Sequence, residues 1–183
     1  MTEGTGSLAG TRDPWARGNP RVGTALLAAL VVALAGSSLS CTREPEPSGV
    51  GPWRFPHTTL ADVKDGLCQP TELSDGRKAT WCFAQPPVRI GGDTAEVDLY
   101  FLGADKAAKL IEIQLKVRGC HEDQLDQWMR TALGPPIEGK PTRSYWKNSF
   151  LWAAALMPSE PGRCIVHFLP LSENAEIARI KER

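Results

Sequence analysis

Two neighbouring segments of the chain alternate apolar and polar residues with the two-residue period of a half-buried strand. In TAEVDLYFLG the apolar positions are Val97, Leu99 and Phe101, and KLIEIQLKV alternates in the same way from Leu110 to Val117. Shorter aromatic or apolar runs, KATWCFAQ, SYWKNSFLWAAALMP and GRCIVHFLP, add further strands. Because strands joined by short turns pair antiparallel, the pattern predicts an antiparallel sheet.

Two other segments place apolar residues at helical spacing. In TTLADVKDGLCQP, Leu60, Val63 and Leu67 fall on one helical face, Thr59 and Asp62 match a capping box, and a proline ends the run. In HEDQLDQWMRTALGPP a longer apolar face is followed by a Gly-Pro stop. The sequence therefore predicts an α+β protein.

The order helix, strand, strand, strand occurs twice along the chain. The matched pairs, 65 to 67 residues apart, are Leu67 with Leu133, Trp81 with Trp146 and Phe101 with Phe168. We interpret this pattern as two α+β units in tandem, residues 56–119 and 120–183, within one compact domain. The alternative is that an α+β chain shows this order by chance.

The N-terminus has the pattern of an export signal. Three arginines precede VGTALLAALVVALAG, an apolar run shorter than the roughly 18 residues that a membrane-spanning helix needs. Residues 1–40 are therefore predicted to be a signal peptide, with an uncleaved membrane anchor as the alternative. Residues 41–55, rich in proline, glycine and charge, are predicted to form a flexible tether.

Two cleavage sites compete. The small residues Ala33 to Ala35 fit an ordinary signal-peptidase site. The sequence SLSC resembles the lipobox of bacterial lipoproteins, although Ser38 stands where that family prefers leucine. This resemblance implies a lipid on Cys41, which would become the first mature residue. It also implies the outer membrane, because Thr42 is not the aspartate that retains enteric lipoproteins at the inner membrane.

The charge and the cysteines bound the biochemical class. The formal net charge is zero, which argues against a nucleic-acid partner. Four cysteines in an exported domain indicate two disulfides, and sequence proximity favours Cys68–Cys82 together with Cys120–Cys164 among the three ways of pairing them. Spacing of the CxxC type is absent, so no metal site is expected.

A helix ending in LG-P, then a strand with tryptophan, then hairpin strands resembles a fold shared by two families. These are the small lipoprotein subunit of the outer-membrane β-barrel assembly machine and the β-lactamase inhibitor protein, which has two such units in tandem. The first unit here has LCQP in place of LG-P. The resemblance implies an antiparallel sheet with helices on one face.

Aromatic residues in SYWKNSFLWAAALMP are candidates for a contact surface on the sheet. They are Tyr145, Trp146, Phe150 and Trp152. The alternative is that these side chains belong to the core, and Trp53 and Phe55 are open to the same two interpretations.

The sequence shows no recognisable catalytic motif. There is no GxSxG element, and the histidine of CHED has no second histidine at the HExxH spacing. We expect His121 to be solvated, His167 to lie on the less buried face of a strand, and His57 to have no specific role. No catalytic residue, cofactor or metal is therefore assigned.

The favoured function is that of a lipid-anchored cell-envelope protein, without enzymatic activity, that binds another protein through its sheet face. The alternatives are an exported enzyme inhibitor, suggested only by the resemblance of fold, and a small hydrolase. A histidine placed against a serine and a carboxylate would favour the hydrolase.

Overall fold

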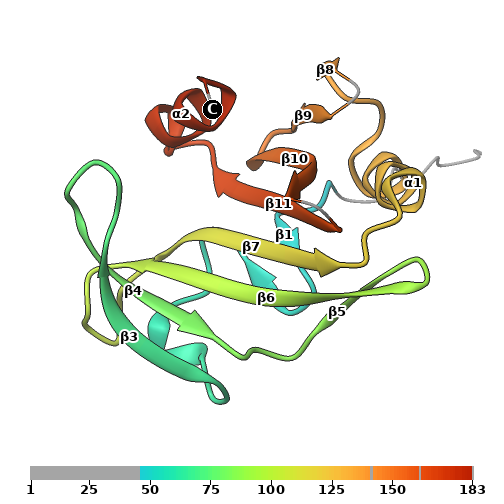
Figure 1. The fold of residues 1–183 in the computed structure, drawn as a ribbon. Coiled ribbons are helices and arrows are strands. Elements are labelled where there is room, and N and C mark those ends of the chain that lie inside the picture. Colours follow the sequence, from blue (N-terminus) through green and yellow to red (C-terminus); the bar gives the residue numbers. More distant parts are fainter. Residues whose placement is uncertain (1–45, 141, 161, 183) are drawn as a thin grey trace, which may run out of the picture. The chain divides into compact units, whose positions relative to one another are not determined.

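The computed structural model describes residues 46–140, 142–160 and 162–182 (Figure 1). The signal peptide, both cleavage sites and Cys41 lie outside the described residues. Within the described part, no helix is long and apolar enough to cross a membrane.

The described chain is built around one antiparallel sheet in the strand order β3-β4-β6-β7-β11-β10-β9-β8, with β5 paired to β6 (Figure 1). The strands are β3 (Leu67–Glu72), β4 (Lys78–Phe83), β5 (Val88–Ile90), β6 (Asp93–Leu102), β7 (Leu110–Arg118), β8 (Glu138–Lys140), β9 (Arg143–Lys147), β10 (Leu151–Glu160) and β11 (Arg163–Pro170). A separate two-stranded sheet joins β1 (Gly49–Val50) to β2 (Trp53–Arg54). The α+β class with an antiparallel sheet is therefore confirmed.

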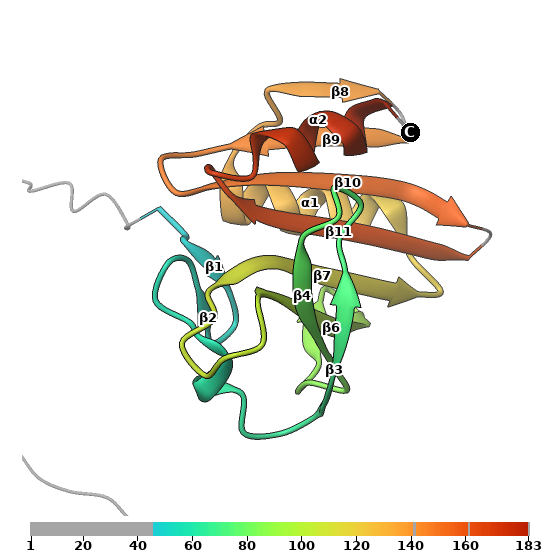
Figure 2. The same ribbon diagram turned by 90° about the vertical axis from the view of Figure 1, so that its left-hand side faces the viewer.

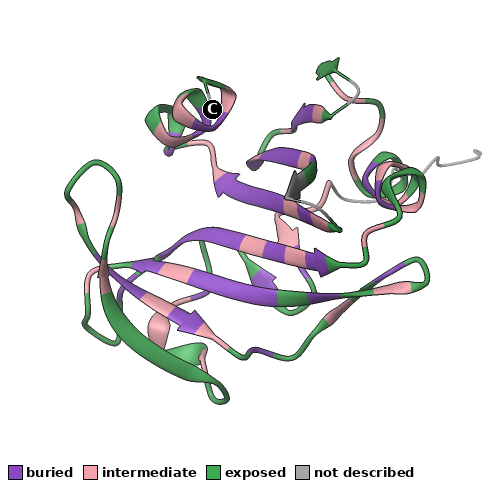
Figure 3. Cartoon of the chain, in the orientation of Figure 1, coloured by how far each residue is buried: buried purple, intermediate pink, exposed green. Residues whose placement is uncertain are grey.

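Helix α1 (Glu122–Leu133) covers one face of the sheet and completes the main core (Figure 3). Its buried residues Leu125 and Met129 pack with alternate residues of the central strands. As predicted, the helix ends at Gly134, which has a φ of 79°. The carbonyl of Gly134 accepts a hydrogen bond of 3.0 Å from Nε1 of the buried Trp146.

Helix α2 (Asn174–Glu182) lies on the opposite face of the sheet (Figures 1 and 2). Its Ile177 and Ile180 pack with Ala154 of β10 in a second buried cluster, whereas the flanking Ala153 and Ala155 belong to the core beneath α1. Successive residues of a strand point to opposite faces, so the two helices cannot share one. The prediction of helices on one face of the sheet is therefore wrong.

The prediction of a helix in the segment TTLADVKDGLCQP is also wrong. Only a single 3₁₀ turn, η1 (Leu60–Asp62), forms there, although the predicted capping box of Thr59 and Asp62 is present. Leu67 lies in β3 and is 63% exposed. The chain turns at Gly66, which has a φ of 96°, and then pairs along its length with β4.

The matched residues of the predicted repeat do not occupy equivalent places. Leu67 is on a strand and Leu133 on a helix. Trp146 belongs to the core beneath α1, whereas Trp81, next to the core residue Cys82 on its strand, faces the other side.

Both favoured disulfides are present. Cys68–Cys82 bridges directly paired residues of β3 and β4. Cys120–Cys164 joins the residue before the N-cap of α1 to β11, across 44 positions of sequence. The second bridge therefore attaches the start of the helix to the sheet that it covers.

Candidate functional site

Helix α2 covers only part of its face of the sheet, and aromatic side chains lie on the remainder. Trp81 of β4 is paired with Tyr100 of β6, and their rings stack with centroids 6.4 Å apart. Phe83 lies 4.7 Å from Trp81, centroid to centroid. All three side chains are only partly buried. We call Trp81, Phe83, Tyr100, Asp98 and Lys116 the aromatic face.

A buried carboxylate fixes this aromatic face in place. Oδ2 of Asp98 accepts a hydrogen bond of 2.8 Å from Nε1 of Trp81 and one of 2.5 Å from Nζ of Lys116. The Lys116 ammonium also lies 5.5 Å from the centre of the Trp81 ring. A hollow of about 460 Å³ opens among these side chains, bounded by Phe83 and Pro87. The aromatic groups are therefore held in one orientation while their outer surfaces stay accessible.

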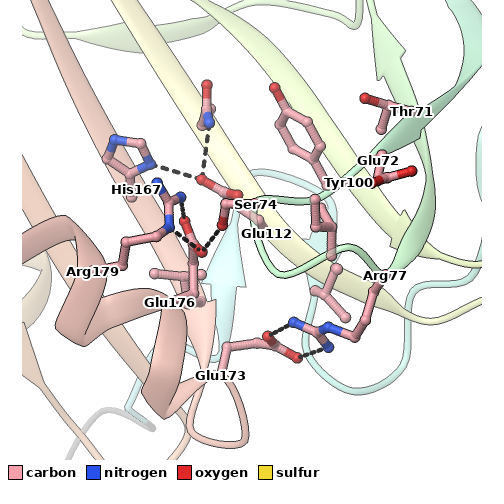
Figure 4. A pocket seen from close by; sticks show the side chains of 14 residues that line it. Thr71, Glu72, Ser74, Arg77, Tyr100, Glu112, His167, Glu173, Glu176 and Arg179 are labelled. Atoms are coloured by element: carbon pink, nitrogen blue, oxygen red, sulfur yellow. Dashed lines mark hydrogen bonds and ion pairs between the residues drawn. The ribbon is translucent and has the colours of Figure 1, made fainter.

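A second hollow, of about 410 Å³, adjoins the aromatic face and is lined by Tyr100 as well (Figure 4). The turn between β3 and β4 forms one wall, α2 forms another, and β6, β7 and β11 form the floor. Four carboxylates and two guanidinium groups line it, so we call it the acidic cleft. Its acidic and basic side chains are Glu72, Glu112, Glu173, Glu176, Arg77, Arg179 and His167.

Ion pairs across the acidic cleft tie the β3–β4 turn to α2 (Figure 4). Arg77 donates two hydrogen bonds, of 3.1 and 2.5 Å, to the carboxylate of Glu173 just before the helix. These bonds raise the pKa of Arg77 above its ordinary value. Glu176 accepts hydrogen bonds from Arg179 and from the Ser74 hydroxyl, the latter at 3.1 Å. Both arginines are therefore already neutralised.

His167 and Glu112 form a buried pair on the floor of the cleft. Nδ1 of His167 lies 2.7 Å from Oε1 of Glu112, and each side chain is 9% exposed. The Gln114 amide donates a 2.9 Å hydrogen bond to the same oxygen. Tyr100 lies close by, and its pKa is raised, first by burial and then by the negative charges of Glu112 and Asp98.

Of the three histidines, His167 lies in a different environment from the one predicted. His167 is buried, because α2 lies over its side of β11, and the expectation of a less buried face is wrong. His121 is exposed at the N-cap of α1, as expected, with Nδ1 3.0 Å from Oδ1 of Asp93. His57 is exposed, and the three histidines do not come together in one site.

The acidic cleft holds part of a catalytic arrangement. A carboxylate that orients an imidazole is how enzymes position a general base. Ser74 lines the same cleft, but its hydroxyl donates to Glu176 and not to His167. No group of three or more metal-ligating side chains gathers anywhere in the described part.

The predicted contact aromatics are mostly not available to a partner. Tyr145 and Trp146 are buried, and so are Trp53 and Phe55, in agreement with the core interpretation. Trp152 is partly buried. The Nζ atom of Lys147 lies 4.5 Å from the centre of the Trp152 ring, and Nε1 of Trp152 donates a hydrogen bond to Oδ1 of Asn174. Phe150, at 46% exposure, is the one exposed residue of the four.

The acidic cleft was not predicted from the sequence, although the polar positions of the strands contain its floor residues. Asp98, Glu112 and Gln114 are the polar positions of two alternating strands, and His167 holds the same kind of position in β11. Their meeting depends on the pairing of β7 with β11, in which Gln114 is opposite His167. Local pattern does not reveal that pairing.

Comparisons with known proteins identify no relative, so a functional conclusion depends on the geometry described above. No family model matches the chain, and no curated protein or solved structure is significantly similar to it.

Proposed function

We propose that this chain is a lipid-anchored cell-envelope protein, without enzymatic activity, that binds another protein through the aromatic face. The observation that carries the proposal is the stack of partly buried Trp81, Phe83 and Tyr100 beside the ion pair of Asp98 and Lys116. Tryptophan and tyrosine dominate the energy of protein interfaces, since they bury a large area and lose little side-chain entropy.

The neighbouring structure supports a protein loop as the occupant. Trp81, which lines the hollow at Phe83, stacks on Tyr100, which lines the acidic cleft. The cleft carries more carboxylates than guanidinium groups, so it complements a positively charged group. The partner is therefore an envelope protein that presents an apolar side chain and a basic side chain from one loop.

The proposed location is the outer membrane, by attachment of lipid to Cys41. The tether predicted over residues 41–55 does not extend to residue 55, because β1 and β2 form within it and Val50, Trp53 and Phe55 are buried in the main core. The support for the lipid attachment is the sequence SLSC after a short apolar run and the proline-rich stretch that follows. Several acyl chains on one residue hold a protein firmly on a membrane. Intact mass spectrometry of the mature protein tests this: a lipid-bearing N-terminal Cys41 is expected, and an unmodified N-terminus at Gly36 would contradict it.

The strand order supports a related proposal about the architecture. The sequence β3-β4-β6-β7 from one edge mirrors β8-β9-β10-β11 from the other, and β7 pairs with β11 at the centre. We propose that residues 56–119 and 120–183 are two similar strand units, of which the second has gained helices.

Crosslinking in cells tests the binding role. The native protein is crosslinked, purified from membranes, and compared with the Trp81→Ala and Phe83→Ala variants. One recurring envelope protein is expected with the native chain and should be lost with both variants. Phe150→Ala is the matched control, because Phe150 is an exposed aromatic residue outside the aromatic face.

A partner retained by the Trp81 and Phe83 variants but lost with Phe150→Ala would overturn the assignment of the face. A recurring enzyme whose activity falls on binding would identify the chain as an inhibitor that acts through the same surface.

A further inference from the structure

One oxygen of Glu112 is left without a partner on the floor of the acidic cleft. Both hydrogen bonds to this carboxylate, from Gln114 and His167, use Oε1. Every fully buried side-chain oxygen or nitrogen of the described residues has a hydrogen-bond partner. Oε2 of Glu112 has none, so this atom is not fully buried. We place it at the surface of the cleft that Glu112 lines. The side chain itself is nine-tenths buried. Figure 4 shows Glu112 among His167, Ser74 and Tyr100.

The other charges of the cleft are matched, and that of Glu112 is not. Arg77 pairs with Glu173, Arg179 pairs with Glu176, and Lys78 pairs with Glu72. Glu112 hydrogen-bonds only with an amide and an imidazole, and neither carries a permanent positive charge. The charge of Glu112 also acts on the Arg179 guanidinium, but that group is hydrogen-bonded to Glu176. A buried carboxylate with no permanent counter-ion favours the entry of a cation.

We propose that the acidic cleft binds the guanidinium or ammonium group of an arginine or lysine side chain, with Oε2 of Glu112 as its counter-ion. This inference rests on the proposed protein-binding function, since the side chain comes from the partner's loop. Tyr100 links the lining of the two hollows, because its ring lines the cleft and stacks on Trp81, which lines the other hollow. The aromatic ring also offers a face over which a cation can lie.

A small mimic of the side chain tests the cleft without knowledge of the partner. The probe is N-acetyl-L-arginine methylamide, added to the isotope-labelled full-length protein purified from membranes in detergent. The signals followed by NMR are those of the Tyr100 ring and the Gln114 side-chain amide. A dissociation constant in the millimolar range is expected, as is usual for one side chain free of its loop.

The neutral isostere N-acetyl-L-citrulline methylamide provides the control for charge. It has the same shape and should leave both signals unchanged in the native protein. Equal shifts from the two probes, or no shift from either, would overturn the inference even if no variant folds.

A pair of variants locates the counter-ion. Glu112→Gln keeps the shape and the acceptor of the side chain but removes its charge, so it should weaken arginine binding about tenfold or more. Glu138→Gln is the matched control, because Glu138 is an exposed carboxylate of β8, lines neither hollow and is already paired with Lys181. An equal effect of both variants would contradict the role of Glu112.

Two further comparisons separate this inference from the proposed function. If the probe fails to bind while Trp81→Ala still abolishes the crosslink in cells, protein binding stands and the cleft inference fails. If agmatine, a free cation, binds more than about a hundredfold tighter than the capped arginine, the ligand is a small molecule and the partner side chain is excluded.

Discussion

Asp98 is buried on β6, at a position that the alternating pattern of its strand marks as polar. It is tolerated there because Trp81 and Lys116 donate to the same carboxylate oxygen. Such a group is stable inside a protein only while its partners remain. The residue therefore links the stability of the sheet to the orientation of the proposed contact aromatics.

The change Asp98→Ala should lower the free energy of unfolding by about 2 kcal/mol, since it leaves the Lys116 ammonium and the Trp81 N–H without an acceptor. Urea denaturation followed by tryptophan fluorescence measures the loss. The control Glu96→Ala removes an exposed carboxylate of the same strand and should cost less than about 0.5 kcal/mol. Equal losses would show that the buried pair contributes nothing specific.

Individual residues of the site were only partly predictable. The alternation identified Glu112, Gln114 and His167 as polar positions, but it assigned His167 to a less buried face. Their burial follows from α2 and from the β3–β4 turn, which approach from distant parts of the chain (Figure 4). Tyr145 and Trp146 show the same limit, because period alone cannot tell a core aromatic residue from an exposed one.

At the scale of elements, α1 formed as predicted and the earlier helix did not. The apolar spacing in HEDQLDQWMRTAL continues for three turns and ends at a glycine, whereas Leu60, Val63 and Leu67 span a glycine and precede a proline. Pairing with β4, together with Cys68–Cys82, makes β3 a strand. The helical nature of α2 was missed, because AEIARI is too short to distinguish a helix from a strand.

Helix α2 should depend on the small cluster beneath it. Ile180→Ala removes a side chain that is 1% exposed and should cost about 3 kcal/mol of unfolding free energy, measured by urea denaturation. Leu67→Ala is the control, since that leucine is largely exposed and should change stability by less than about 0.5 kcal/mol. A small loss at Ile180 would mean that α2 is not firmly docked on the sheet.

The start of α1 should weaken in acid. The backbone N–H of His121 donates to Asp93 and its imidazole lies beside the same carboxylate, so the pKa of Asp93 is lowered below its ordinary value. A lowered pKa contributes stability that is present above about pH 4 and is lost as the pH falls through the folded-state value. Denaturation at about pH 5 and about pH 3 should show a smaller acid-induced loss for Asp93→Asn than for the native protein. An unchanged loss in the variant would contradict this role.

At the scale of the whole described domain, two four-stranded runs meet where β7 pairs with β11. The disulfide Cys120–Cys164 reinforces the same region, because it ties the chain between β7 and α1 to β11. The central strands β4, β6, β7 and β11 and both disulfides could be predicted from local pattern and proximity, whereas the β3 segment was predicted as a helix. The strand order could not, since it depends on contacts between residues far apart in the sequence.

Removing the long-range disulfide should cost more than removing the local one. In the chain-entropy model, the loop closed by Cys120–Cys164 corresponds to about 4 kcal/mol and that closed by Cys68–Cys82 to about 3 kcal/mol. The two double-alanine variants are compared by thermal and urea denaturation. The reverse order of losses would show that loop length does not govern the stabilisation.

The measurement that tests the central claim most directly is site-specific photo-crosslinking in cells. A photoreactive amino acid is placed at Phe83 on the aromatic face and, as the control, at Gln127, an exposed position of α1 on the other side of the sheet. The proposed function predicts one envelope protein crosslinked from Phe83 and none from Gln127. Crosslinking of that protein from Gln127 alone, or of no protein from Phe83, would contradict it.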